Sequence, residues 1–389
     1  MKNVLKKAVS LMLCLLVVMG LYPTDAYADT SKKVPYTLES NVARTDKVQN
    51  KGEINWYTYT MTEDGTVSFK FTPDMVQLVS TNGSWDVNVY DANYNKLEEY
   101  DYYNKVITTG NYNFVKGTVF YISVESAGYM KESVGIDYSI VANYHALNNW
   151  EIEDFANTRK VTTLSNKTAT YGSMYSSKDE DVFQYKIPAN GPTKFVFDIP
   201  DYDEKAVDYG WEITFSDASN SKINSQKVTT KYTSQILNFK KGTTLRITVK
   251  PYISSAAPVN VEYTLTPQTT SSSSWEVEGN NSFAKATKIT SKMKGTLYKY
   301  EDSDYYVYKA TGAKSQVKLT SNDSTDKISN GWRVRVYDKN KKLMKDFYTY
   351  STSSATFKTK KNQKYYIVIT PGTFSSPVDA VYTLTCKKK

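Results

Sequence analysis

The chain has 389 residues, of which 14% are aromatic and 23% charged, so it is long enough for about two to four domains and is not a disordered polyampholyte. It contains one histidine and two cysteines. Catalysis by a histidine beside a nucleophile, or a zinc site built on paired histidines, therefore cannot be built here in the usual way. The net charge of +9 is modest and comes with no Arg-rich helix, so we do not expect nucleic acid as a partner.

Residues 1–28 have the features of an export signal. A basic start, an apolar stretch and a small-x-small cleavage pattern follow one another: Lys2, Lys6, Lys7, Ala8–Leu21 and Ala26-Tyr27-Ala28. We expect a signal peptide at 1–28 and a mature chain that begins at Asp29, carries a net charge of +7 and has Cys386 as its one cysteine. The mature chain then has no integral membrane segment and no internal disulfide. This pattern predicts a secreted protein, extracellular or loosely associated with the cell surface.

After that segment the sequence repeats itself three times. A Trp opens an alternating strand in each repeat, and a strand with a Tyr closes it: Trp85, Trp211, Trp332 and Tyr138, Tyr263, Tyr382. The offsets are 126 and 121 residues between the tryptophans and 125 and 119 between the tyrosines. An aromatic strand precedes each Trp in the same order. The repeating unit is therefore a domain of about 120 residues, which is much longer than a solenoid repeat.

Within each unit, large or β-branched residues alternate with polar ones, and turn signals arrive at short intervals. This pattern predicts an all-β protein of three tandem antiparallel β-sandwich domains, jelly-roll-like, at residues 35–144, 150–266 and 275–386. Residues 145–149 and 266–274 are the predicted linkers, and the second, rich in Ser and Thr, is expected to be the more flexible. We expect the recurring Trp to fill each core; stacking on a ligand is the alternative.

The third unit opens with an acidic segment and has an aspartate pair before its aromatic strand. The segment is Glu276-Val277-Glu278-Gly279-Asn280-Asn281-Ser282, and the pair is Asp302-Ser303-Asp304. Together with the strands W-x-V-x-V-Y-D and K-Y-Y-I-V-I, in this order, these motifs make the unit resemble the bacterial pre-peptidase C-terminal family. Those β-sandwich domains are appended to secreted proteases and form the collagen-binding modules of clostridial collagenases. The resemblance covers most of the third unit and implies three tandem copies of this domain.

The other two units keep parts of these motifs. The second unit retains the four acids Glu151, Glu153, Asp179 and Asp181, but it has Phe155 and Ala156 where the third has Asn280 and Asn281. In the first unit, Glu53 and Asn55 replace the aspartate pair. The match to the family therefore weakens from the third unit to the first.

The resemblance implies a calcium site at the acidic opening, and the residue types suggest the same cation. Calcium takes six to eight oxygen ligands, and alternate residues of an extended segment project to the same side. Two glutamates of the opening can therefore converge with the two aspartates. The predicted metal ligands are Glu276, Glu278, Asn280, Asp302, Asp304, Glu151, Glu153, Asp179 and Asp181. The alternative is a solvated acidic strand end that binds no ion.

These features lead to one functional hypothesis and two alternatives. We predict a secreted, non-catalytic binding module that attaches to an extracellular protein or polysaccharide, possesses no enzymatic activity and is stabilised by Ca²⁺. The aromatic strands Tyr100–Tyr103 and Phe347–Tyr350 are candidate contact surfaces. The first alternative is a structural stalk or assembly component of the cell surface. The second is a carbohydrate-active enzyme, which would need two acids about 5 to 10 Å apart across a cleft.

Overall fold

A computed structural model describes the chain at residues 34–78, 83–127, 133–146, 149–153, 160–199, 209–259, 261–289, 292–299, 301–321, 331–372 and 380–389. The predicted signal peptide and the residues Phe155 and Ala156 lie outside these ranges. Among the residues described, no helix is both long and apolar enough to cross a membrane.

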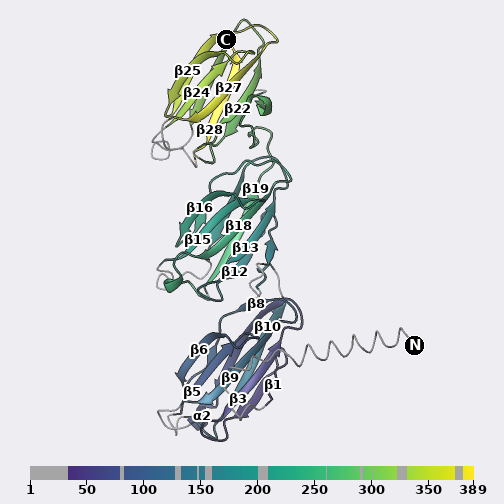
Figure 1. Ribbon diagram of the computed structural model, residues 1–389, viewed down its shortest axis with the longest axis vertical. Coiled ribbons are helices and arrows are strands. Elements are labelled where there is room, and N and C mark those ends of the chain that lie inside the picture. The colour runs from purple at the N-terminus through teal and green to yellow at the C-terminus, as the bar shows by residue number, and fades with distance from the viewer. Residues whose placement is uncertain are drawn as a thin grey trace, which may run out of the picture.

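The described residues form six β-sheets, arranged as three pairs that follow one another along the chain and along the long axis of the molecule (Figure 1). The helical content is small. One short helix, α2 (Met75–Leu78), and two 3₁₀ turns, η2 (Ser254–Ala256) and η3 (Phe283–Lys285), are present in the described ranges. The predicted all-β fold of tandem jelly-roll-like sandwiches is confirmed.

In the first unit, the five-stranded sheet has the order β1-β3-β9-β5-β6 and the second sheet the order β2-β10-β4-β7, with β8 also paired to β4. The first sheet comprises β1 (Tyr36–Thr37), β3 (Ile54–Thr60), β9 (Val119–Ser126), β5 (Trp85–Tyr90) and β6 (Lys96–Tyr103). The second comprises β2 (Arg44–Lys47), β10 (Asp137–Ala146), β4 (Gly65–Pro73), β7 (Ile107–Thr108) and β8 (Tyr112–Phe114).

The second unit has the sheet orders β11-β13-β18-β15-β16 and β12-β19-β14-β17. The first of these sheets comprises β11 (Val161–Thr163), β13 (Asp181–Lys186), β18 (Thr244–Pro251), β15 (Trp211–Asp217) and β16 (Lys222–Val228). The other comprises β12 (Thr170–Ser173), β19 (Glu262–Thr269), β14 (Thr193–Asp198) and β17 (Tyr232–Thr233).

The third unit has the orders β20-β22-β27-β24-β25 and β21-β28-β23-β26, so the strand sequence of the second unit recurs. The first sheet comprises β20 (Thr287–Lys288), β22 (Asp304–Lys309), β27 (Lys364–Pro371), β24 (Trp332–Tyr337) and β25 (Leu343–Thr349). The other comprises β21 (Lys292–Gly295), β28 (Tyr382–Lys388), β23 (Lys314–Ser321) and β26 (Thr352–Lys358).

In each unit, one edge of the sheet that contains the Trp strand departs from the antiparallel pattern. The pairs β1 with β3, β11 with β13 and β20 with β22 are parallel. Alternation of apolar and polar residues is the same in both kinds of pairing, so it does not distinguish a short parallel edge strand from an antiparallel one.

Each sandwich encloses its own hydrophobic core. Trp85, Trp211 and Trp332 are completely buried, as the alternation of their strands predicts. In the third unit, the ring of Trp332 packs edge-on against Tyr382 of the facing sheet, with ring centroids 6.2 Å apart. The recurring Trp therefore joins the two sheets of a sandwich, and the ligand-stacking alternative does not apply to it.

The strands continue beyond the predicted ends of the units. Strand β10 runs to Ala146, where His145 pairs with Thr66, and β19 runs to Thr269, which pairs with Thr193. The polar residues assigned to the starts of the two linkers are thus partly sheet residues. Thr suits a half-buried strand as well as a linker, and composition alone did not separate the two.

Candidate metal centre

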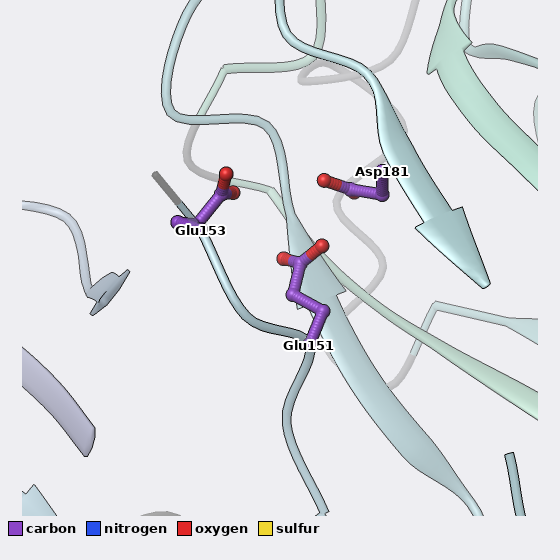
Figure 2. Close-up of side chains that lie close together, drawn as sticks. All are labelled: Glu151, Glu153 and Asp181. Atoms are coloured by element: carbon purple, nitrogen blue, oxygen red, sulfur yellow. The ribbon is translucent and has the colours of Figure 1, made fainter. Parts of the chain in front are cut away.

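Two groups of three buried carboxylates occur in the described part of the chain, one in the second unit and one in the third. The second-unit cluster is Glu151, Glu153 and Asp181, and the third-unit cluster is Glu276, Glu278 and Asp304. Within each cluster, one carboxylate oxygen from every residue lies within 4.8 Å of the others. Figure 2 shows the three side chains of the second-unit cluster facing a common space. All six belong to the predicted ligand set.

The glutamates of each cluster come from one extended segment beside the second sheet. The amide of Glu276 donates to the carbonyl of Lys294 at 2.9 Å, and the amide of Glu151 donates to that of Tyr171 at the same distance. Because the segment is extended, Glu278 and Glu153 project to the same side as their partners two residues earlier. This alternation brings two carboxylates from each opening together.

The aspartates of the clusters occupy the same register in their sheets. Asp181 begins β13 opposite Val249, and Asp304 begins β22 opposite Ile369. In the first unit this position, opposite Val124, is held by Asn55. The three units can therefore be compared residue by residue.

A dense set of hydrogen bonds holds the third-unit cluster. Glu276 accepts from the amide of Thr296 at 2.7 Å, from the hydroxyl of Tyr306 at 2.7 Å and from the Asn280 amide nitrogen at 3.2 Å. The hydroxyl of Tyr382 bonds to Asp304 at 2.5 Å. In the second unit, the equivalent tyrosine donates to Asp181, and the amide of Ser173 donates to Glu151 at 2.7 Å.

Several buried oxygens in and beside the third-unit cluster have no hydrogen-bond partner in the described part of the chain. They are Oδ1 of Asp304, Oδ1 of Asn280 and both carboxylate oxygens of Glu278, and these residues are at most 8% exposed. In the second unit, Oδ1 of Asp181 likewise has no hydrogen-bond partner among the described residues. A buried polar atom without a partner costs about 1–3 kcal/mol, and more if it is charged. The arrangement is thus incomplete as a hydrogen-bond network and leaves oxygens available to a cation.

Burial and mutual repulsion make the clusters reluctant to ionise. Burial first, and neighbouring carboxylates second, raise the pKa values of Glu151, Asp181, Glu278 and Asp304 well above their ordinary range. Both effects penalise closely spaced negative charges without a counter-ion. A divalent cation removes that penalty because it neutralises the group and supplies the missing partner for each oxygen.

The two other predicted aspartates lie beside the clusters and have a different contact pattern. Asp302 accepts from the amides of Tyr298 and Ser303, at 3.1 and 2.8 Å. Asp179 accepts in the same way from the amides of Tyr175 and Glu180, at 2.9 and 2.7 Å. Burial raises the pKa of Asp302 to about 7 and that of Asp179 to about 6. Each of these aspartates fixes the loop that leads into the strand of the cluster aspartate.

The second-unit cluster lines a cavity of about 20 Å³, together with Asp179 and several neighbours. A space of roughly 10–15 Å³ on this measure holds one water molecule. The cavity therefore suits a single ion or water and is far smaller than the roughly 300–1,000 Å³ of pockets that bind organic ligands.

Sequence reasoning overlooked two residue types that build these sites. The closing tyrosines were recognised as strand landmarks, although Tyr263 and Tyr382 contact the cluster aspartates directly. Opposite them stand Gly172 and Gly295, where a Cβ atom would overlap the tyrosine side chain. A glycine recurs before the aspartate pair in the second and third units, and this recurrence could have indicated the position of the tyrosine that contacts the cluster.

Comparisons with known proteins give no family for this chain. No family model matches it, and no curated protein matches it. Among solved structures, the pre-peptidase C-terminal domain of a Bacillus anthracis collagenase aligns at 10% identity and a TM-score of 0.23, over 29% of this chain and 97% of that domain. An M60 catalytic domain with two CBM51 domains from Clostridium perfringens aligns at 10% identity and a TM-score of 0.22, over 94% of this chain and 39% of the other. A triple jelly-roll protein of an archaeal virus aligns at 8% identity and a TM-score of 0.22, over 90% of this chain and 89% of the other.

Proposed function

We propose that this chain is a secreted, non-catalytic binding module of tandem β-sandwiches, stabilised by calcium at the second and third units, that attaches to an extracellular protein or polysaccharide. The observation that carries the calcium site is the buried carboxylate cluster that recurs at the same register in two units. Buried charges in proteins are normally paired or coordinate a metal, because an uncompensated buried charge is costly.

The ligand set favours calcium over other metals. It consists of carboxylate and amide oxygens with no sulfur or imidazole, which is the donor set of hard cations. Calcium accepts six to eight oxygens in irregular geometry, whereas magnesium demands an octahedron and keeps most of its water. Three carboxylates that offer two oxygens each, together with Asn280 in the third unit, suit the larger and more tolerant ion.

The same geometry argues for ion binding over catalysis at these carboxylates. A sugar ring does not fit a cavity of about 20 Å³, and the cluster residues of the third unit are at most 8% exposed. A glycosidase pair must flank a substrate in an open cleft. We therefore propose that the acidic residues hold a cation and support the fold.

Calcium titration of the whole chain by isothermal calorimetry tests the site. We expect two calcium ions per chain, and one in either single variant Asp181→Asn or Asp304→Asn. Asp46→Asn is the matched control, because Asp46 accepts a hydrogen bond from Tyr57 in the first unit but belongs to no cluster in the described residues. The absence of a binding heat in the unmodified chain, together with a thermal melt that EDTA does not change, would falsify the calcium site.

The attachment partner requires a separate test. Tyr348 and Tyr350 on and beside β25 are 51% and 59% exposed, and the guanidinium of Arg333 lies 5.3 Å from the ring centre of Tyr348. Exposed rings of this kind stack on sugars and pack against proteins. We expect the chain to be retained on at least one of insoluble collagen, peptidoglycan, chitin or cellulose, and the Tyr348→Ala, Tyr350→Ala double variant to be retained less.

A structural stalk remains the second candidate function, because consecutive units contact each other through hydrogen bonds. Asn111 donates to Glu262 at 3.0 Å, and Gln235 donates to the carbonyl of Tyr298 at 3.0 Å. A chain whose units dock on one another is suited to keeping the structures attached at its two ends at a fixed distance. Failure to bind any polymer of the panel, combined with intact calcium binding, favours the stalk.

A further inference from the structure

The preceding unit reaches each acidic cluster through an Asn-Phe pair. These pairs are Asn113-Phe114, at the end of β8, and Asn238-Phe239 in the second unit. The backbone carbonyl of Asn113 accepts from the amide of Glu153 at 2.7 Å, and that of Asn238 accepts from the amide of Glu278 at 2.8 Å. Both joints therefore make the same contact, on the second glutamate of the cluster.

The side chains of these two asparagines are buried with incomplete hydrogen bonding. Asn113 is 1% exposed, and neither polar atom of its amide has a partner among the residues that the structure describes. Asn238 is fully buried; its nitrogen donates to Oγ1 of Thr296 at 3.1 Å, but its oxygen has no partner in the same described ranges. The amide of Thr296 donates in turn to Glu276. Through Thr296, the side chain of Asn238 is thus linked to Glu276 of the cluster, and its buried amide oxygen has no donor among the described residues.

The phenylalanines of the pairs pack on the loops that carry the second buried aspartate. The ring of Phe114 lies 5.8 Å from that of Tyr175, and the ring of Phe239 lies 5.3 Å from that of Tyr298. These are the tyrosines whose backbone amides bond to Asp179 and Asp302. The loop that shapes each acidic site is therefore also the surface on which the preceding unit rests.

The third unit lacks the pair. Asn113 and Asn238 stand three residues before Lys116 and Lys241, and the matching position before Lys361 is Lys358, followed by Thr359. Lys358 is exposed. The first and second units therefore have the Asn-Phe pair at this position, and each of them precedes an acidic cluster.

We propose that calcium at each cluster also fastens the unit that holds it to the unit before it, with the buried amide oxygen of Asn113 or Asn238 as the ligand that the preceding unit supplies. This inference rests on the proposed calcium site. Because coupling between two equilibria is reciprocal, docking of the preceding unit raises the affinity for calcium by the same factor by which calcium favours docking. Calcium then converts three joined domains into one stiff rod.

Two measurements on the whole chain test the coupling. Calcium titration compares the unmodified chain with the double variant Asn113→Ala, Asn238→Ala and with the matched control Lys358→Ala. We expect the affinity to fall at least tenfold in the double variant and to stay unchanged in the control. Small-angle X-ray scattering gives the spread of maximum dimensions, which calcium should narrow in the unmodified chain and in Lys358→Ala but not in the double variant.

The outcomes separate the joint from the site. If the double variant binds calcium with unchanged affinity and calcium narrows its spread of maximum dimensions as in the unmodified chain, the proposed joint is overturned. The proposed calcium site is then unaffected. No calcium binding to the unmodified chain overturns both. Thermal melting in EDTA shows whether the double variant folds. If it does not, Asn113→Leu with Asn238→Leu keeps the side-chain volume, removes the oxygen, and is judged by the same affinity and scattering results.

Discussion

The residue at the register of the cluster aspartate is one difference between the first unit and the other two. At the register of Asp181 and Asp304, the first unit has Asn55, which donates to the hydroxyl of Tyr138 at 2.8 Å and to the carbonyl of Lys47 at 2.9 Å. The carboxylate that accepts from Tyr57 there is Asp46, on β2 itself. The first unit thus fills this end of the sandwich with a satisfied amide and one carboxylate, so it has no need of a cation.

The variant Asn55→Asp tests this account. It removes both donated hydrogen bonds and adds a buried charge near Asp46, without the glutamates that would complete an ion site. We expect destabilisation of the first unit by roughly 2–4 kcal/mol at pH 7, since an uncompensated buried charge is costly. Urea unfolding monitored by tryptophan fluorescence measures it, and calcium should not restore the loss. If the variant is as stable as the unmodified chain, the charge at position 55 is solvated by water, and the account is contradicted.

Cys386 gives a second prediction at the scale of one residue. It is 3% exposed in the third core, and burial raises the pKa of its thiol to about 12. The raised pKa favours the neutral thiol in the folded state, so the reactive thiolate stays scarce until the pH approaches 12, whereas the unfolded chain supplies it from about pH 8.5. In a Cys14→Ser variant at pH 8, we expect Ellman's reagent to react within minutes in guanidinium and only over hours in buffer. Equal rates in both solutions contradict a buried thiol.

At the scale of the strand, glycine makes room for the clusters. Gly172 in β12 faces Tyr263, and Gly295 in β21 faces Tyr382. In the first unit, the residue opposite Tyr138 is Asp46, which has a side chain. A glycine at this point of the strand therefore distinguishes the two units that have a cluster from the one that has none.

Gly295→Ala should disturb the third-unit cluster selectively. The new Cβ would overlap the Tyr382 hydroxyl and the Glu276 carboxylate, both of which are buried and hydrogen-bonded. Overpacking of this kind costs roughly 1–3 kcal/mol, and the displaced ligands should lose calcium affinity. Calorimetry is expected to show one calcium per chain instead of two. Gly312→Ala is the control, because its Cβ meets only the flexible side chain of Lys388, and a loss of binding there too would refute the explanation.

Much of the fold could be predicted from the sequence because it depends on local alternation and on a repeat. The Trp strands and closing strands were located from the repeat and from period two. The sequence predicted that the two glutamates of an opening converge with both aspartates, and the structure has one aspartate of each pair in the cluster. The contributions of Asn113 and Asn238 could not be predicted, because they come from the preceding unit and depend on how two domains meet. Strand ends such as Thr269 were also missed, since Ser and Thr occur in linkers and in sheets alike.

At the scale of the molecule, calcium should stabilise the second and third units most, because each of them has an acidic cluster, and the first unit less, because it contributes only through its joint. A ligand that binds only the folded form at 100 times its dissociation constant stabilises that form by about 2.7 kcal/mol. Hydrogen exchange at the closing strands reports each unit separately: β10 for the first, β19 for the second and β28 for the third. We expect calcium to slow exchange about 100-fold in β19 and β28 and much less in β10, because the first unit has an amide where the others have the cluster aspartate.

The pattern of protection also distinguishes local from shared stabilisation. If calcium acts only within the unit that binds it, the variant Asp304→Asn removes the effect from β28 and leaves β19 protected. If the joints transmit the stabilisation, as the proposed role of Asn238 predicts, loss of the third-unit site also weakens the contacts between the third-unit opening and the second unit. In calcium, residues around Asn238 should then exchange faster in Asp304→Asn than in the unmodified chain. Slower exchange in β10 equal to that in β28 would contradict the assignment of calcium to two units, because no acidic cluster occurs in the described residues of the first.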